Sequence, residues 1–148
     1  MPAIYDNTDL LWTRRGDVVL GHDGDLADTY NDPLRSVVQE MRSRVEADFG
    51  DWYFHEDIAA ALNRFVGEPN NKLTAENIKI SVVAAITKYG LVRTSDVKVR
   101  YLPIDSDKLM IRIRLLVAPT ARNVASQEVN IQLLYSYSEN NVYIIPGR

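Results

Sequence analysis

The chain has 148 residues, of which 46% are hydrophobic and 25% are charged, a balance typical of one globular domain with its own core. Because the sequence contains no cysteine, it excludes disulfides, thiolate chemistry and cysteine-based zinc sites. The net charge of −3 gives no general reason to expect nucleic-acid binding, and no apolar run is long enough to cross a membrane. We predict a single domain over residues 1–148, with a polar tail at 1–9 that is not a secretory signal, folded in a reducing cytoplasm.

Two short apolar runs open the chain, at residues 10–13 and 18–20. The residues between them have turn chemistry, so the pattern predicts a small hairpin or two short edge strands. The following loop, 21–25, contains Asp23 and Asp25, which suggest a calcium loop. A closing glutamate at the twelfth position is missing, so an ordinary loop without metal is the favoured interpretation. We find no internal repeat.

Three stretches have the spacing of helices with one apolar face. The first begins at Asp32 and Pro33, which suit the N-cap and the first helical position. The second follows an aromatic corner at residues 49–54, whose large side chains we expect to be buried. Thr74 is a suitable N-cap for the third. The apolar positions are Leu34, Val37, Val38, Met41 and Val45 in the first stretch, Ile58, Ala61, Leu62 and Phe65 in the second, and Ile78, Val82, Ala85, Ile86 and Tyr89 in the third.

After Gly90 the apolar residues change from a helical period to a period of two. Alternation at residues 97–101 and 109–117 predicts a hairpin with one buried face. Residues 129–137 form another alternating strand, and 142–145 a short last one. The predicted class is therefore α+β, with an N-terminal hairpin, three helices packed on a mainly antiparallel sheet, and C-terminal strands.

Few residues are candidates for catalysis. The sequence contains no P-loop, no Gly-x-Ser-x-Gly and no dinucleotide fingerprint, and we interpret His22 and His55 as surface or turn residues. The 20 acidic residues offer many pairs for glycoside hydrolysis, as they would in any chain of this length, so no pair is singled out. We predict no catalytic residue, no cofactor and no metal ligand.

The predicted hairpin carries basic residues on the face opposite its apolar one, namely Lys98, Arg100, Arg112 and Arg114. One interpretation is that outward charges prevent strand edges from aggregating. The other is a docking surface for an acidic protein partner, and the sequence leaves both open. The strand at 129–137 likewise fits either an ordinary internal strand or one that pairs with another chain by strand addition.

A series of motifs in a fixed order resembles one known family. The series begins with Gly-Asp-Leu-Ala at 24–27 and Asp-Pro-Leu at 32–34, where a helix opens. Phe-Gly-Asp-Trp at 49–52 and Leu-Asn-Arg-Phe-Val-Gly-Glu-Pro-Asn at 62–70 follow. Over residues 10–118 the chain resembles the small baseplate wedge, or sheath-initiator, proteins of contractile-tailed bacteriophages. Relatives in type VI secretion baseplates belong to the same group, and some members are described as lysozyme-like.

The resemblance implies a structural, non-catalytic role in the virion, at the tail baseplate, after assembly in the host cytoplasm. The implied partners are the tail sheath protein, baseplate wedge proteins and, as a further candidate, tail tube proteins, with no nucleic acid and no membrane. Sheath assembly would begin by strand pairing, and Arg93, the only part kept of a family Glu-Pro-Arg motif, would contact the wedge core. The residues expected in these contacts are Arg93, Val129, Ile131, Leu133, Tyr135 and Tyr137. A peptidoglycan-cleaving enzyme and a type VI secretion subunit remain as alternatives.

Overall fold

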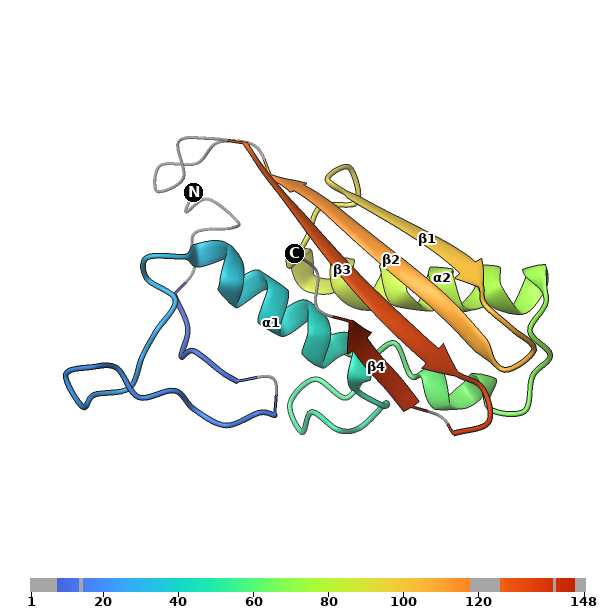
Figure 1. Ribbon diagram of the computed structural model, residues 1–148, viewed down its shortest axis with the longest axis horizontal. Coiled ribbons are helices and arrows are strands. Elements are labelled where there is room, and N and C mark those ends of the chain that lie inside the picture. Colours follow the sequence, from blue (N-terminus) through green and yellow to red (C-terminus); the bar gives the residue numbers. More distant parts are fainter. Residues whose placement is uncertain (1–7, 14, 118–125, 140, 146–148) are drawn as a thin grey trace.

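The computed structural model describes residues 8–13, 15–117, 126–139 and 141–145. Within these ranges there are two α-helices, α1 (Pro33–Glu46) and α2 (Lys72–Thr87), and two 3-10 turns, η1 (Leu62–Phe65) and η2 (Lys88–Gly90). The four strands are β1 (Val97–Pro103), β2 (Lys108–Val117), β3 (Gln127–Ser136) and β4 (Asn141–Ile145). They form one antiparallel sheet in the order β1-β2-β3-β4, and both helices pack against the same face of it (Figure 1).

The core lies between the sheet and the two helices. Successive side chains of a strand point to opposite faces, so the alternation in β2 buries Ile111 and Ile113 and exposes Arg112 and Arg114. From α1 the core receives Leu34, Val37, Met41 and Val45, and from α2 it receives Ala75, Ile78, Val82, Ala85 and Ile86. The α+β class and the antiparallel sheet therefore agree with the sequence pattern.

The prediction of three helices is wrong, because the described residues contain only two. The stretch from 55 to 61 is not helical, and only the single 3-10 turn η1 follows it. Its backbone instead bonds to the end of α1, where the N–H of Ala60 donates to the carbonyl of Arg44 at 2.9 Å. Ala61 donates to Ala47 at 3.2 Å and has a left-handed backbone with a φ of 49°.

The physical reason is burial on all sides. Ile58, Ala59, Ala60, Ala61 and Leu62 are all at most 6% exposed, although a surface helix would turn two or three of any five consecutive residues outward. Small alanine side chains let this segment approach α1 closely enough for backbone hydrogen bonds. Those bonds replace the ones that a helix would make within itself.

Residues 9–13 and 15–32 form three consecutive passes with an eight-residue spacing, which we call the octad module, rather than only one hairpin. The N–H groups of Leu11, Val19 and Ala27 donate around a closed ring, each to the carbonyl of another member, at 2.8–3.1 Å. A second set of three N–H···O bonds, each 2.8 Å long, joins Thr13 to Asp17, Gly21 to Asp25 and Thr29 to Asp9.

Equivalent groups in the two sets of bonds are eight residues apart. The chain therefore contains an internal repeat, and the expectation of none is wrong. Gly16 and Gly24 occupy the same place in successive passes and have φ values of 85° and 83°, which favour glycine. The side chain of Gln39 attaches the module to α1. Its amide donates to the carbonyl of Leu10 at 3.1 Å and accepts from the N–H of Trp12 at 2.9 Å.

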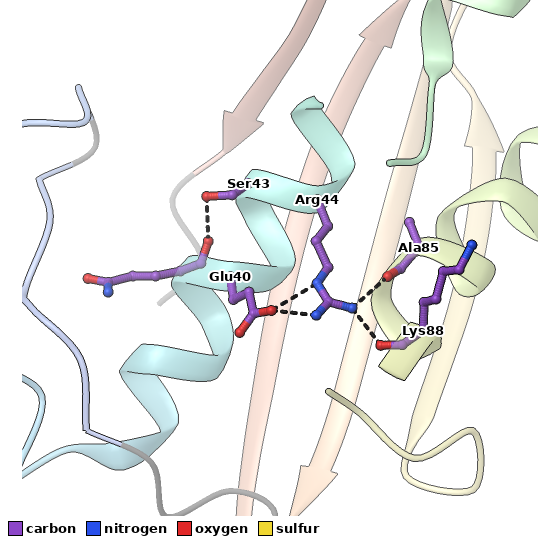
Figure 2. A network of polar contacts seen from close by, with 6 residues as sticks. Glu40, Ser43, Arg44, Ala85 and Lys88 are labelled. Carbon is purple, nitrogen blue, oxygen red and sulfur yellow. Dashed lines mark hydrogen bonds and ion pairs between the residues drawn. The ribbon is translucent and has the colours of Figure 1, made fainter. Parts of the chain in front are cut away.

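A buried arginine joins the two helices. Arg44 in α1 is 4% exposed, and its guanidinium pairs with the carboxylate of Glu40 one turn earlier. Its other donors reach the carbonyl oxygens of Ala85 at 3.1 Å and Lys88 at 2.7 Å (Figure 2). These two carbonyls lie at the C-terminal end of α2, where helix carbonyls lack partners of their own and the helix dipole favours a cation.

Asp107 joins the two turns at one end of the sheet. Its carboxylate accepts from the hydroxyl of Ser136 at 2.7 Å and from the N–H of Ser138 at 2.8 Å. The N–H of Tyr137 donates to its carbonyl at 2.9 Å. The hydrogen bond from Ser136 is the main cause that lowers the pKa of Asp107 below its ordinary value of 3.8.

We expect Asp107→Asn to remove part of the acid sensitivity of the fold. A lowered folded-state pKa means that the unfolded chain binds the proton more readily, so the stabilisation is present above pH 3.8 and is lost as the pH falls through the folded-state value. Urea unfolding at neutral pH and near pH 3 should show a smaller loss of stability for Asp107→Asn than for wild type. Asp17→Asn, in the octad module, is the matched control, and an unchanged acid response in Asp107→Asn would contradict the assignment.

Candidate interaction surfaces

The predicted contact residues of β3, together with Tyr137 just after it, lie inside the molecule. Ile131, Leu133, Tyr135 and Tyr137 are at most 6% exposed, and Val129 is partly buried against the same core. The hydroxyl of Tyr135 donates to the carbonyl of Leu62 at 2.8 Å. These side chains face the helices and hold them on the sheet, so they do not form an outer surface.

Arg93 is exposed in the turn that leads into β1, where its carbonyl accepts from the N–H of Asp96 at 3.0 Å. Because β1 and β4 are the opposite outer strands of the sheet, the structure does not bring Arg93 together with the C-terminal strands. The sequence-predicted residues therefore do not form one site.

The strand available for pairing on the C-terminal side is β4, which pairs with residues 132–136 of β3. In the described parts of the chain, the outer edge of β4 has no neighbouring strand. Tyr143 in this strand is 45% exposed, and its hydroxyl donates to Glu139 at 2.6 Å. Nothing in the alternation of residues 129–137 distinguishes an interior strand from an outer one, and only the sheet order does so.

The four basic residues of the predicted hairpin do come together, on the sheet face away from the helices. Lys98 lies directly opposite Arg114, and Arg100 lies opposite Arg112. With Glu128 of β3 they line a hollow of ≈ 220 Å³. Arg114 donates to Glu128 at 2.6 Å, and this hydrogen bond is the main cause that lowers the pKa of Glu128.

An apolar row adjoins this basic hollow on the same face. The register places Leu102 opposite Met110, Met110 opposite Leu134, and Leu134 opposite Tyr143, so the row crosses all four strands. Leu102 is 58% exposed. The outer face is thus divided into a basic part and an apolar part.

A second hollow lies between the octad module, α1 and the aromatic corner. It measures ≈ 590 Å³, and its lining includes Trp12, Trp52, Glu40, Arg42 and Glu46. Burial raises the pKa of Glu46, and the nearby Arg42 partly opposes that rise.

The expectation that the aromatic corner is buried is wrong. Tyr53 and Phe54 are 83% and 87% exposed, and their rings meet edge to face at 5.0 Å. The corner is part of a loop closed by backbone bonds, in which the N–H of Gly50 donates to the carbonyl of Glu56 at 2.9 Å. The rings therefore point away from the core that α1 and α2 fill.

Among the residues that the structure describes, no group of three or more His, Asp or Glu side chains is placed to hold a metal. Asp23 accepts from the N–H of Asp25 at 3.2 Å, and His55 lies beside the ring of Tyr89. No helix in the described ranges is long and apolar enough to cross a membrane. No family model, curated protein or solved structure matches this chain.

Proposed function

We propose that this chain is a structural subunit of a contractile-tail baseplate, which binds the wedge core and starts tail-sheath assembly by strand pairing. Two arguments support the proposal. The first is the resemblance of residues 10–118 to sheath-initiator proteins. The second, which carries it, is the position of β4 as an outer strand whose far edge is available among the described residues.

Strand addition requires an edge with backbone N–H and C=O groups that face outward, and an extended segment of a partner then continues the sheet. Among the described C-terminal strands, β4 meets this condition along its whole outer edge. One edge of β3 is covered by β2 along its whole length and the other by β4 at residues 132–136, so at most a short stretch before residue 132 has no neighbouring strand on that side. We therefore assign the sheath contact to β4 and keep Val129, Ile131, Leu133, Tyr135 and Tyr137 as the core that supports it. Arg93, in the turn before the opposite outer strand β1, is assigned to the wedge core.

The test is co-purification of the cognate sheath protein with the full chain and with a variant that lacks residues 141–148. A deletion that began before β3 would be uninformative, because β3 supplies the buried Leu133 and Tyr135. We expect the shorter variant to keep a cooperative thermal transition and to lose the sheath protein. Removal of residues 1–7 is the matched control and should retain binding.

Unchanged sheath binding after loss of 141–148 would contradict strand pairing at β4. Binding to neither sheath nor wedge proteins by the full chain would overturn the baseplate proposal as a whole. A muralytic assay on the purified chain tests the peptidoglycan-cleaving alternative. Cleavage of peptidoglycan in that assay would also overturn the structural proposal. Genomic neighbours distinguish a phage tail from a type VI secretion baseplate.

A further inference from the structure

We propose that the outer face of the sheet is a docking surface for an acidic segment of a partner protein. Carboxylates of that segment would enter the basic hollow formed by Lys98, Arg100, Arg112 and Arg114, and its apolar side chains would cover the row formed by Leu102, Met110, Leu134 and Tyr143. The surface is a face of the sheet and not an edge, so the inference holds independently of strand pairing at β4.

Protection of strand edges does not account for these charges. It explains Lys98 and Arg100, because β1 is an outer strand. Arg112 and Arg114 lie on β2, which is paired with β1 on one side and with β3 on the other and has no edge to protect. Half of the basic residues therefore need another explanation.

The arrangement is also unfavourable for the isolated fold. Like charges directly opposite each other on neighbouring strands are destabilising, and this face has two such pairs in successive rows, Lys98 with Arg114 and Arg100 with Arg112. One ion pair offsets them in the described part of the chain, between Arg114 and Glu128. A bound anion would relieve this repulsion, and the hollow between the four side chains has room for one or two carboxylates.

The apolar row decides the class of partner. A nucleic acid would use the cations but would leave Leu102 and Tyr143 in contact with water or phosphate, and the chain as a whole carries a charge of −3. A protein segment can supply carboxylates for the basic hollow and, next to them in its sequence, apolar side chains for the apolar row. Charged and apolar parts side by side are typical of protein interfaces with a dry centre and a polar rim.

The probe is a fluorescein-labelled peptide of about 16 residues, long enough to cover both parts of the face in an extended conformation. Its first half alternates glutamate with serine, and its second half alternates leucine with serine. Companion probes carry glutamine or lysine in place of glutamate, and a duplex DNA of similar charge is a further comparison. Fluorescence anisotropy measures the affinity of each for the full chain at low and at physiological salt.

We expect the glutamate peptide to bind and the glutamine peptide to bind at least about tenfold more weakly. Arg112→Glu should lower the affinity for the glutamate peptide by at least about tenfold. Arg35→Glu makes the same charge change on the exposed side of α1 and should change that affinity less than about twofold. In Arg100→Glu/Arg112→Glu, the lysine peptide should bind better than the glutamate peptide.

Thermal unfolding separates docking from folding. Arg112→Glu replaces the like-charge pair with Arg100 by an opposite-charge pair but adds a carboxylate near Glu128, so its melting temperature should stay close to that of wild type. Equal binding of the glutamate and glutamine peptides, or an Arg112→Glu effect no larger than that of Arg35→Glu, would overturn the proposal. Stronger binding of the DNA than of the glutamate peptide would also overturn it, in favour of a nucleic-acid surface.

Discussion

Replacement of Arg44 by alanine is expected to lower the free energy of unfolding by about 2–3 kcal/mol. The side chain is buried between α1 and α2, and its loss removes the guanidinium donor from the carbonyl groups of Ala85 and Lys88 (Figure 2). Glu40 would lose its cation too. Its side chain is 39% exposed, so water can solvate the carboxylate, which keeps the expected loss below that of a fully buried ion pair.

Arg44→Lys should recover only a small part of this loss. An ammonium group keeps the positive charge but cannot direct separate donors at Glu40 and at two carbonyl groups of α2. Arg35→Ala is the matched control, because Arg35 is an exposed residue of the same helix, and it should change stability by less than about 0.5 kcal/mol. Chemical denaturation of the three variants measures the differences. A loss below about 1 kcal/mol for Arg44→Ala would contradict the assigned role.

Tyr135→Ala is expected to be the most damaging substitution in the chain, with a loss of about 3–5 kcal/mol. The ring is fully buried in β3 and packs edge to face against Tyr137 at 5.1 Å. Its hydroxyl donates to the carbonyl of Leu62, at the start of η1, so the side chain also fixes the segment that replaces the expected second helix. Removal of the ring would open a cavity at the centre of the core.

Tyr135→Phe separates the two contributions, because it keeps the ring and removes the hydroxyl. We expect a loss of about 1–2 kcal/mol from the missing hydrogen bond to the carbonyl of Leu62. Tyr53→Phe is the control, since that side chain is 83% exposed and its hydroxyl lies outside the core. Denaturant titration of the three variants should rank Tyr135→Ala first, Tyr135→Phe second and Tyr53→Phe last. Any other order would show that β3 does not support the core as described.

The same variant gives a pH signature. Burial raises the pKa of Tyr135 from 10.0 to about 12, so the unfolded chain loses this proton at a lower pH than the folded chain. The stabilisation is complete below pH 10 and is lost as the pH rises through about 12. Wild type should therefore lose more stability than Tyr135→Phe across this window. An equal loss of unfolding free energy in the two proteins over this pH range would contradict the burial of the hydroxyl.

Sequence patterns were sufficient to predict the elements whose side chains divide cleanly into an exposed side and a buried side. Pro33 opens α1, as its position after Asp32 predicted, and the alternation at 109–117 matches β2 to within one residue. The third predicted helix is α2, although its N-cap is Asn71, whose side chain accepts from the N–H of Thr74. The basic residues of the hairpin were also found from the sequence, because the period of two assigns them all to one face.

Features that depend on which backbone groups bond to each other could be read only from the folded molecule. A run such as 58–62 shows the same apolar spacing whether its N–H groups bond within a helix or to the end of α1, and only the neighbouring chain selects between them. The octad module is likewise held by a ring of bonds between residues eight or sixteen positions apart and by further bonds between residues four or twenty positions apart. Neither helical nor strand periodicity reports this pattern. The interior position of β3 also could not be predicted from the sequence. An alternating pattern shows which side chains are buried, but it does not show which strands lie on either side.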